Sequence, residues 1–269
     1  MNEDRIRAKY PANRYQPVLI SEVTRMNSGY HCVAGWDIHG QRMVRPLPLL
    51  GSNWRLGTDR TVFSVGHLIN CIPSGIQNNV LPHGKEDFPL SKTPTLLEKY
   101  EEPEIYAFLL DKAFRSISEL FGCRLVDDKY IPENSNCCSL GGVRILRRRT
   151  RFNMDSFGTP RLDMRDNNNV LYHLPITSDD LHRMYCADDK KRSSFNTEEA
   201  ERWLCSITAE SEIILRIGLA RGWAGRDGDW NPLRCYIQLN GIICPTGESR
   251  LIRKHEQGPS IEFDDDVPF

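Results

Sequence analysis

The 269-residue sequence predicts a mainly β fold with some α-helix, arranged as two small barrels followed by a flexible acidic C-terminal tail. Three observations lead to this prediction. Short runs of β-branched and aromatic residues, separated by turn residues, fill most of both halves of the chain. The pair Gly141-Gly142 ends a polar segment in the middle of the chain and marks a boundary between two units. A run of aspartates stands close to the C-terminus.

The first half is predicted to begin with a β-meander. Its three strand-like runs are separated by turn residues and cover residues 16–26, 30–38 and 41–46. A further run covers residues 61–72, and the segment rich in Pro, Asn and Gly over residues 73–94 predicts a long surface loop. Apolar residues at helical spacing predict a helix over residues 112–121. We therefore assign residues 1–140 to a first barrel-like domain with a long loop and helical insertion.

The second half has a more regular order of predicted elements. Three strands cover residues 143–152, 159–165 and 170–177. Two helical segments follow at residues 178–186 and 197–207, with Ser178 and either Asn196 or Thr197 as N-caps. Two strands, at residues 212–220 and 233–243, complete residues 141–245 as a second domain. Three strands, a helical region and two strands is the order of a five-stranded OB barrel, although SH3-like barrels and α+β sheets can give a similar order.

Three segments carry a family resemblance. They are CVAGWDIHGQRMVRPLP at residues 32–48, LRIGLARGW at residues 215–223 and CYIQLNGI at residues 235–242. These segments resemble the prokaryotic proteins described as dual OB-containing domain proteins, and the resemblance covers about residues 18–243. It implies two OB-like barrels and no established catalytic chemistry.

The overall charge limits the possible partners. Lys and Arg total 35 and Asp and Glu total 36, so a nucleic-acid site requires a local excess of basic residues. No apolar stretch reaches the roughly 18 residues that span a bilayer, and the N-terminus is charged where a secretory signal is apolar. We therefore expect a cytoplasmic protein with no membrane partner.

The sequence contains no recognisable catalytic or metal-binding motif. Its nine cysteines are scattered and include no C-x-x-C pair, so we expect free thiols. The histidines form no H-E-x-x-H motif, and no glycine-rich phosphate loop precedes a helix. The sequence thus predicts no cofactor, no metal and no catalytic residue. Acidic pairs such as Asp179-Asp180 leave open the alternative of a nucleic-acid-processing or base-modifying enzyme.

Residues 246–269 are predicted to be a linker and an acidic partner-binding tail. The chain ends with the partner-binding candidates Asp264, Asp265, Asp266, Val267, Pro268 and Phe269. This ending resembles the acidic C-terminal tip of bacterial single-stranded-DNA-binding proteins. The resemblance implies recruitment of repair, recombination or replication enzymes. Physically, the Phe269 ring suits an apolar pocket, and its carboxylate suits a basic residue at the pocket rim.

A local excess of basic residues lies at the start of the second domain. Residues 141–165 contain seven arginines and two aspartates, and aromatic residues lie among them and in the loop between the last two strands. The candidate nucleic-acid-binding residues are Arg144, Arg147, Arg148, Arg149, Arg151, Phe152, Arg161, Arg221, Trp223 and Trp230. Two plainer alternatives remain: the arginines form a solvated strand edge, and Trp223 packs in the core.

These features together predict a protein that binds single-stranded nucleic acid, with DNA favoured over RNA. Its tail is predicted to recruit a repair, recombination, replication or antiviral defence enzyme that has an apolar pocket with a basic rim. The main alternative is an enzyme that acts on nucleic acid and docks on a replication or repair partner through the same tail. A third possibility is an adaptor whose barrels bind protein.

Overall fold

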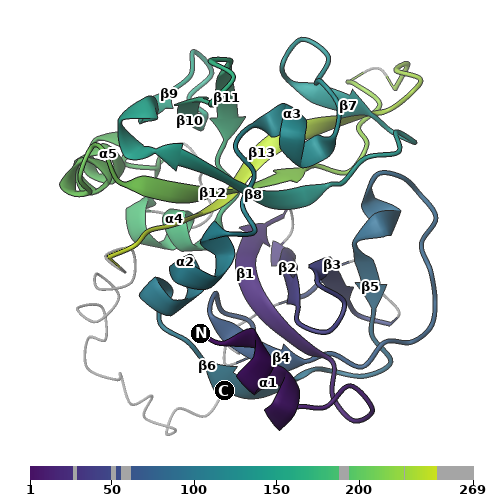
Figure 1. Cartoon of the computed structure of the whole chain (residues 1–269). Coiled ribbons are helices and arrows are strands. Elements are labelled where there is room, and N and C mark those ends of the chain that lie inside the picture. The colour runs from purple at the N-terminus through teal and green to yellow at the C-terminus, as the bar shows by residue number, and fades with distance from the viewer. Residues whose placement is uncertain (27–28, 50–52, 56–61, 188–193, 227, 247–269) are drawn as a thin grey trace, which may run out of the picture.

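The computed structural model of the chain describes residues 1–26, 29–49, 53–55, 62–187, 194–226 and 228–246. The fold is mainly β, with strands in three curled sheets and short helices around them (Figure 1). The predicted tail at residues 247–269 lies outside the described residues. No helix in the described part of the chain is both long and apolar enough to cross a membrane.

The first unit contains a six-stranded sheet in the order β5-β3-β2-β1-β4-β6. Its strands are β1 (Pro17–Arg25), β2 (His31–Asp37), β3 (Arg42–Leu47), β4 (His67–Asn70), β5 (Asp87–Pro89) and β6 (Thr95–Lys99). The antiparallel pairing of β1 with β2 and of β2 with β3 confirms the predicted meander. A bridge between Pro73 and Leu90 joins the segments that follow β4 and β5, so the sheet curls.

Two of the elements predicted for the first unit differ from the structure. The predicted strand at residues 61–72 is shortened to β4, and the predicted loop at residues 73–94 contains a short 3₁₀ helix, η2 (His83–Lys85), and the strand β5. The strand β5 pairs in parallel with β3 and ends at Pro89. Because proline is confined to edges and ends of strands, this composition hides such a short strand from sequence analysis.

The second unit follows the predicted order of strands, two helices and two strands, but it has four strands over the residues where three were predicted before the helices. Its elements are β8 (Leu140–Leu146), β9 (Thr150–Met154), β10 (Pro160–Arg165), β11 (Leu171–Pro175), α4 (Asp179–Tyr185), α5 (Thr197–Ser206), β12 (Glu212–Leu219) and β13 (Arg234–Ile243). The N-caps are Ser178, which accepts a hydrogen bond from the backbone of Leu181, and Asn196, which accepts one from Glu199. Asn196 is thus the cap of α5.

The predicted first strand of the second unit is two strands. A 3₁₀ turn, η3 (Arg147–Arg149), separates β8 from β9. This break lets β8 pair with β12 in one sheet, while β9 pairs with β10 in another. The two sheets have the orders β7-β13-β12-β8 and β11-β10-β9, and a bridge between Ile176 and Leu239 joins the chain just after β11 to β13.

The predicted domain boundary at residue 140 falls inside the second unit. The helix α3 (Ile117–Phe121) buries Ile117, Leu120 and Phe121 in the second core, and the strand β7 (Tyr130–Pro132) pairs with β13. Only the last part of the predicted helix at residues 112–121 is helical, because Ser116 caps the helix at that point. The preceding helix, α2 (Glu102–Leu110), packs in the first core together with α1 (Glu3–Lys9).

The two units share a tightly packed seam. Ile214 and Ile243 of the second unit lie in the core cluster that contains Leu19 and Ile105 of the first unit. Beside this apolar contact, Glu22 of β1 accepts hydrogen bonds from Arg216 Nε at 3.0 Å and from the Asn240 amide at 3.1 Å. All three polar side chains are buried, so the seam contains an ion pair within the protein.

Candidate nucleic-acid interface

The structure separates the two parts of the predicted nucleic-acid surface. Along the ladder between β8 and β12, Leu146 pairs with Glu212, whereas Leu140 pairs with Gly218. The turn η3 therefore lies at the start of β12, and the loop with the two tryptophans follows its end. At about 3.3 Å per residue, the two ends of this strand are roughly 23 Å apart. Figure 1 shows the same separation, with β9 and the loop after β12 on opposite sides of the upper unit.

Each arginine of η3 forms a hydrogen bond or ion pair with another part of the protein. Arg147 Nε donates to the carbonyl of Ile207 at 3.0 Å, at the C-terminal end of α5. Arg148 forms an exposed ion pair with Glu210 at 2.8 Å, and Arg149 donates to the carbonyl of Asp166 at 2.9 Å. These contacts attach η3 to its neighbours, which is a structural role.

The other candidates in this region divide between surface and core. Arg151 is exposed on β9, Arg144 is half-buried on β8, and Arg161 forms an ion pair with Asp155 at 2.7 Å. Phe152 is only 3% exposed, and its ring lies 6.1 Å from that of Phe195. Phe152 is therefore a core residue and is removed from the candidate surface.

The tryptophan loop and the neighbouring strands present a cluster of packed aromatic side chains. Trp223 is 46% exposed, and its ring lies 5.0 Å from Trp230 and 6.2 Å from Tyr236. The Arg234 guanidinium lies over Trp230 at 3.7 Å and over Tyr130 at 4.8 Å. We call these five side chains the aromatic platform. It contains both predicted tryptophans and three residues that the sequence analysis missed.

The platform is held by strand β13 and by backbone contacts within the loop. The backbones of Trp223 and Arg234 exchange two hydrogen bonds of 3.1 Å each. Arg234 and Tyr236 stand two residues apart on β13, so their side chains share one face of the strand. Gly225 has φ +86°, and a Cβ there would approach the Trp230 ring to 2.9 Å. The alternation of residues 234 and 236 is the sequence signal that would have revealed these two members.

Arg221 lies where the loop meets the first unit. Its Nη2 donates to Asp87 Oδ1 of β5 at 2.9 Å, and the same carboxylate binds Arg45 of β3. Burial alone would raise the pKa of Asp87, but the two guanidinium groups bring it below its usual value. Asp87 is therefore ionised and connects the two units.

A buried histidine lies beside this contact. His83 Nε2 donates to the carbonyl of Leu219, the last residue of β12, at 3.0 Å. Burial, together with Arg45 and Arg221, lowers the pKa of His83 to about 4. The imidazole is therefore neutral at neutral pH, and this fixes the proton on Nε2.

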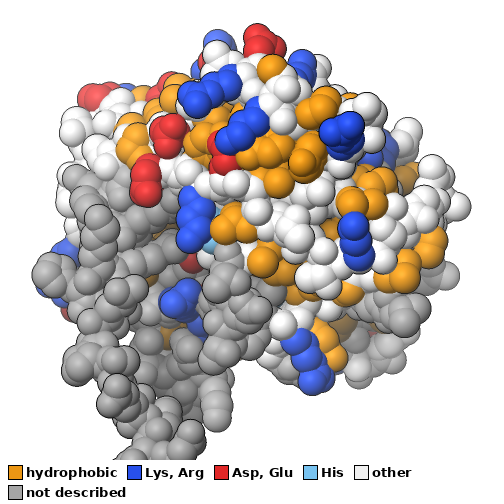
Figure 2. All heavy atoms as spheres, turned by 90° about the horizontal axis from the view of Figure 1, so that it is seen from below, with side chains coloured by type: hydrophobic (Ala, Val, Ile, Leu, Met, Phe, Trp, Pro, Cys, Tyr) orange, Lys and Arg blue, Asp and Glu red, His pale blue; other side chains and the backbone are white. Residues whose placement is uncertain are grey.

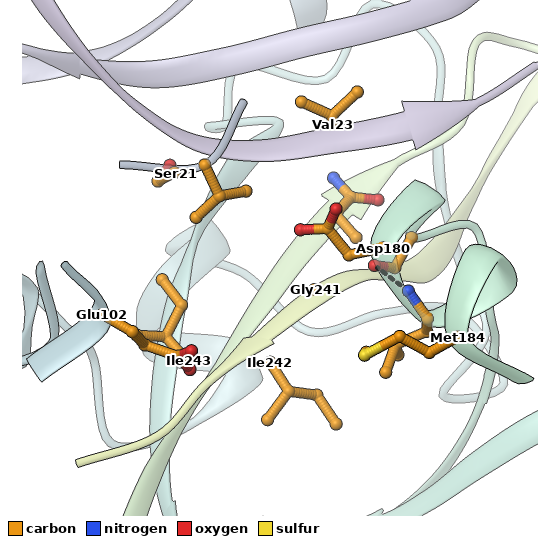
Figure 3. Close-up of a pocket in the computed structure, with 12 residues that line it drawn as sticks. Ser21, Val23, Glu102, Asp180, Met184, Gly241, Ile242 and Ile243 are labelled. Carbon is orange, nitrogen blue, oxygen red and sulfur yellow. Dashed lines mark hydrogen bonds between the residues drawn. The ribbon is translucent and has the colours of Figure 1, made fainter. Parts of the chain in front are cut away.

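Two other regions of the molecule lack the features of the platform. The small cavity in Figure 3 lies in the seam, between Ser21 and Val23 of β1, Asp180 and Met184 of α4, and residues 241–243 of β13. Its volume of about 20 Å³ holds about one water molecule and no nucleotide. On the face shown in Figure 2, Lys and Arg side chains are spread singly among hydrophobic ones. The described residues on that face thus form no continuous basic patch.

All nine cysteines are free thiols, and the described residues bring together no group of three or more His, Cys, Asp or Glu side chains that suits a metal ion. The candidates Asp264, Asp265, Asp266, Val267, Pro268 and Phe269 lie outside the described residues.

Comparison of the chain with protein-family models found no matching family, and comparison with curated proteins found no match either. The resemblances described above therefore remain predictions.

Proposed function

We propose that this protein binds single-stranded nucleic acid, with DNA favoured over RNA, on the aromatic platform, and that its tail recruits an enzyme to the strand. The observation that carries the proposal is the exposed Trp223 ring, packed against Trp230 and Tyr236 beside Arg234. Proteins that bind single strands use such aromatic side chains to stack bases and cationic groups to contact phosphates. Stacking requires unpaired bases, so a single strand is favoured over a duplex.

The strand pairing supports the further proposal that both units are OB-like barrels. In the first unit, neighbouring strands follow the circuit β1-β2-β3-β5-β4-β1, closed by the bridge between Pro73 and Leu90. In the second, β8 and β9 act as one bent strand in the circuit β9-β10-β11-β13-β12-β8, with the bridge between Ile176 and Leu239 as the closing contact. The two tryptophans of the platform then lie in the loop between the fourth and fifth barrel strands, one of the loops that OB folds use for oligonucleotides.

The proposed role of the tail rests on its sequence. The residues 264–269 combine a negatively charged run, a proline and an aromatic residue. The charges steer the tail toward a basic surface, and the Phe269 ring fits an apolar pocket there. The partner is accordingly an enzyme of repair, recombination, replication or defence with such a pocket.

The strand-binding proposal is tested by fluorescence anisotropy with labelled single-stranded DNA, single-stranded RNA and duplex DNA of equal length. We expect tighter binding of the single strands. The logarithm of their binding constant should fall linearly with the logarithm of the salt concentration. Equal affinity for duplex and single strand, or no binding at low salt, would contradict the proposal. Strand cleavage or base modification in the same samples would favour the enzyme alternative.

The recruitment proposal is tested by comparing the full chain with a chain that lacks Phe269. Both are used as bait in a prokaryotic lysate, and the captured nucleic-acid enzymes are identified by mass spectrometry. We expect that deletion abolishes their capture and leaves strand affinity within twofold. Unchanged capture of the same enzymes would refute the role of the tail.

A further inference from the structure

A pocket lies between the two units, next to the aromatic platform. Its volume is about 320 Å³, within the range of pockets that bind small ligands. Both units contribute to its wall, and the residues that matter here are Arg25, Arg45, His83, Arg221, Tyr236 and Gln238. Tyr236 belongs to the platform as well, so the pocket and the platform are continuous.

The wall of the pocket is positively charged. Among the described residues that line it are three arginines and no aspartate or glutamate. The balancing carboxylates lie behind the arginines: Asp179 binds Arg25 at 2.7 Å, and Asp87 binds both Arg45 and Arg221. Because one carboxylate serves two guanidinium groups, positive charge remains on the pocket side. Glu86, the other acidic group near Arg45, is buried and bonded to Ser139, and burial raises its pKa.

Arg221 is the arginine best placed to contact a ligand. Its side chain is 39% exposed, and within the described part of the chain it donates one side-chain hydrogen bond, from Nη2 to Asp87. A guanidinium group has five N–H donors, so Arg221 keeps donors for a second anion. By contrast, the Arg45 side chain is 3% exposed and bonded to both Asp87 and Ser139, which gives it a positioning role.

The neutral groups of the wall suit a nucleotide better than a bare anion. His83 donates through Nε2 to Leu219, so Nδ1 is a hydrogen-bond acceptor. The Gln238 amide offers a donor and an acceptor, and the Tyr236 ring offers a flat apolar face. Donors for phosphate, polar groups for a sugar or base edge and an aromatic face are thus within one wall.

We propose that this pocket binds a nucleoside phosphate, with the phosphate against Arg221 and Arg25. The phosphate comes either from the end of a strand whose neighbouring bases lie on the platform or from a free nucleotide. The strand-end form rests on the proposed function. A terminal phosphate suits the pocket better than an internal one, because it carries more negative charge. It also has only one ester bond, so the strand enters the pocket from the platform side and does not have to leave it on the other side.

The test uses the full-length protein and anisotropy with oligonucleotides that carry a 5′-phosphate, a 3′-phosphate or hydroxyl groups only. Unlabelled nucleoside monophosphate serves as a competitor. We expect one phosphorylated end to bind about tenfold more tightly than the hydroxyl end, as for one added charge-assisted hydrogen bond. Arg221→Gln is expected to remove this preference, and Arg5→Gln, which removes the same charge from exposed α1, is expected to keep it.

A second variant guards against misfolding of the first. Gln238→Glu adds a carboxylate to the wall at nearly constant size, and we expect it to weaken the phosphorylated strand while the hydroxyl strand binds as before. Competition by the free nucleotide without any end preference would identify the free nucleotide as the ligand. Equal binding of all ends together with no competition would overturn the proposal, and the proposed function would stand if the strands still bound. Nucleotide binding without strand binding, measured directly by isothermal titration calorimetry, would instead overturn the proposed function alone.

Discussion

The two ends of β12 carry the residues most typical of nucleic-acid binding, but they use them differently. At its start, Arg147 and Arg149 donate to main-chain carbonyls, and Arg148 pairs with Glu210. At its end, Trp223 remains 46% exposed within a cluster of rings. The guanidinium groups at the start are occupied by contacts within the protein, whereas the Trp223 ring at the end is exposed. Residue type alone thus shows which side chains could bind nucleic acid. The hydrogen bonds within the protein decide which of them are available to do so.

The largest expected effect is on strand affinity at the end of β12. The double variant Trp223→Ala/Trp230→Ala removes two stacking rings, each worth about 1–3 kcal/mol per base, so we expect at least tenfold weaker binding of single-stranded DNA. Anisotropy at fixed salt measures the change. Phe157→Ala is the matched control, because Phe157 is 90% exposed in a different loop. If the control weakened binding as much as the double variant, the contrast between the two ends would be lost.

The end of β12 should also make the stability of the protein depend on pH. His83 supports the end of β12, and its pKa is lowered to about 4, while an unfolded histidine titrates near 6.5. Between these values the unfolded chain binds the proton more readily, so stability falls as pH falls through this window. We expect His83 to account for about 2 kcal/mol of the stability lost between pH 7 and pH 5.

Urea unfolding of the native protein and of His83→Gln checks this expectation. Glutamine keeps an amide donor for the Leu219 carbonyl but does not titrate, so the variant should lose less stability between pH 7 and pH 5. An equal loss in both proteins would show that His83 is not responsible.

The smallest effects are expected at the start of β12. Arg147→Gln removes the hydrogen bond to Ile207, which should cost about 1 kcal/mol, or about 2–4 °C in melting temperature, with strand affinity within twofold. Arg148→Gln removes only an exposed ion pair and should stay within about 0.5 kcal/mol of the native protein. Thermal unfolding and anisotropy measure both variants. A large loss of strand affinity in either one would assign η3 to the binding surface after all.

The sequence predicts the order of elements in the second unit well because its strands alternate and its helices begin at clear N-caps, Ser178 and Asn196. It does not predict the turn η3, because the arginine run that forms it looks like a continuation of a strand. The domain boundary predicted at residue 140 is misplaced, because the tertiary contacts of α3 and β7 attach these preceding segments to the second unit in spite of the local glycine signal.

The candidate site was predictable only in part. Trp223 and Trp230 are close in sequence, so their loop stands out. Tyr130 comes from β7, whose pairing with β13 is a long-range contact with no local signal. The burial of Phe152 likewise depends on Phe195, which is distant in sequence.

The seam makes the stability of each unit depend on the other. Arg216 is buried in one unit, and its counter-charge, Glu22, is in the other. The first unit alone would leave the Glu22 carboxylate without its counter-charge. The second unit alone would expose the apolar Ile214 and Ile243 and leave Arg216 unpaired. Breaking such a buried ion pair costs about 3–5 kcal/mol. We therefore expect that neither unit folds stably without the other.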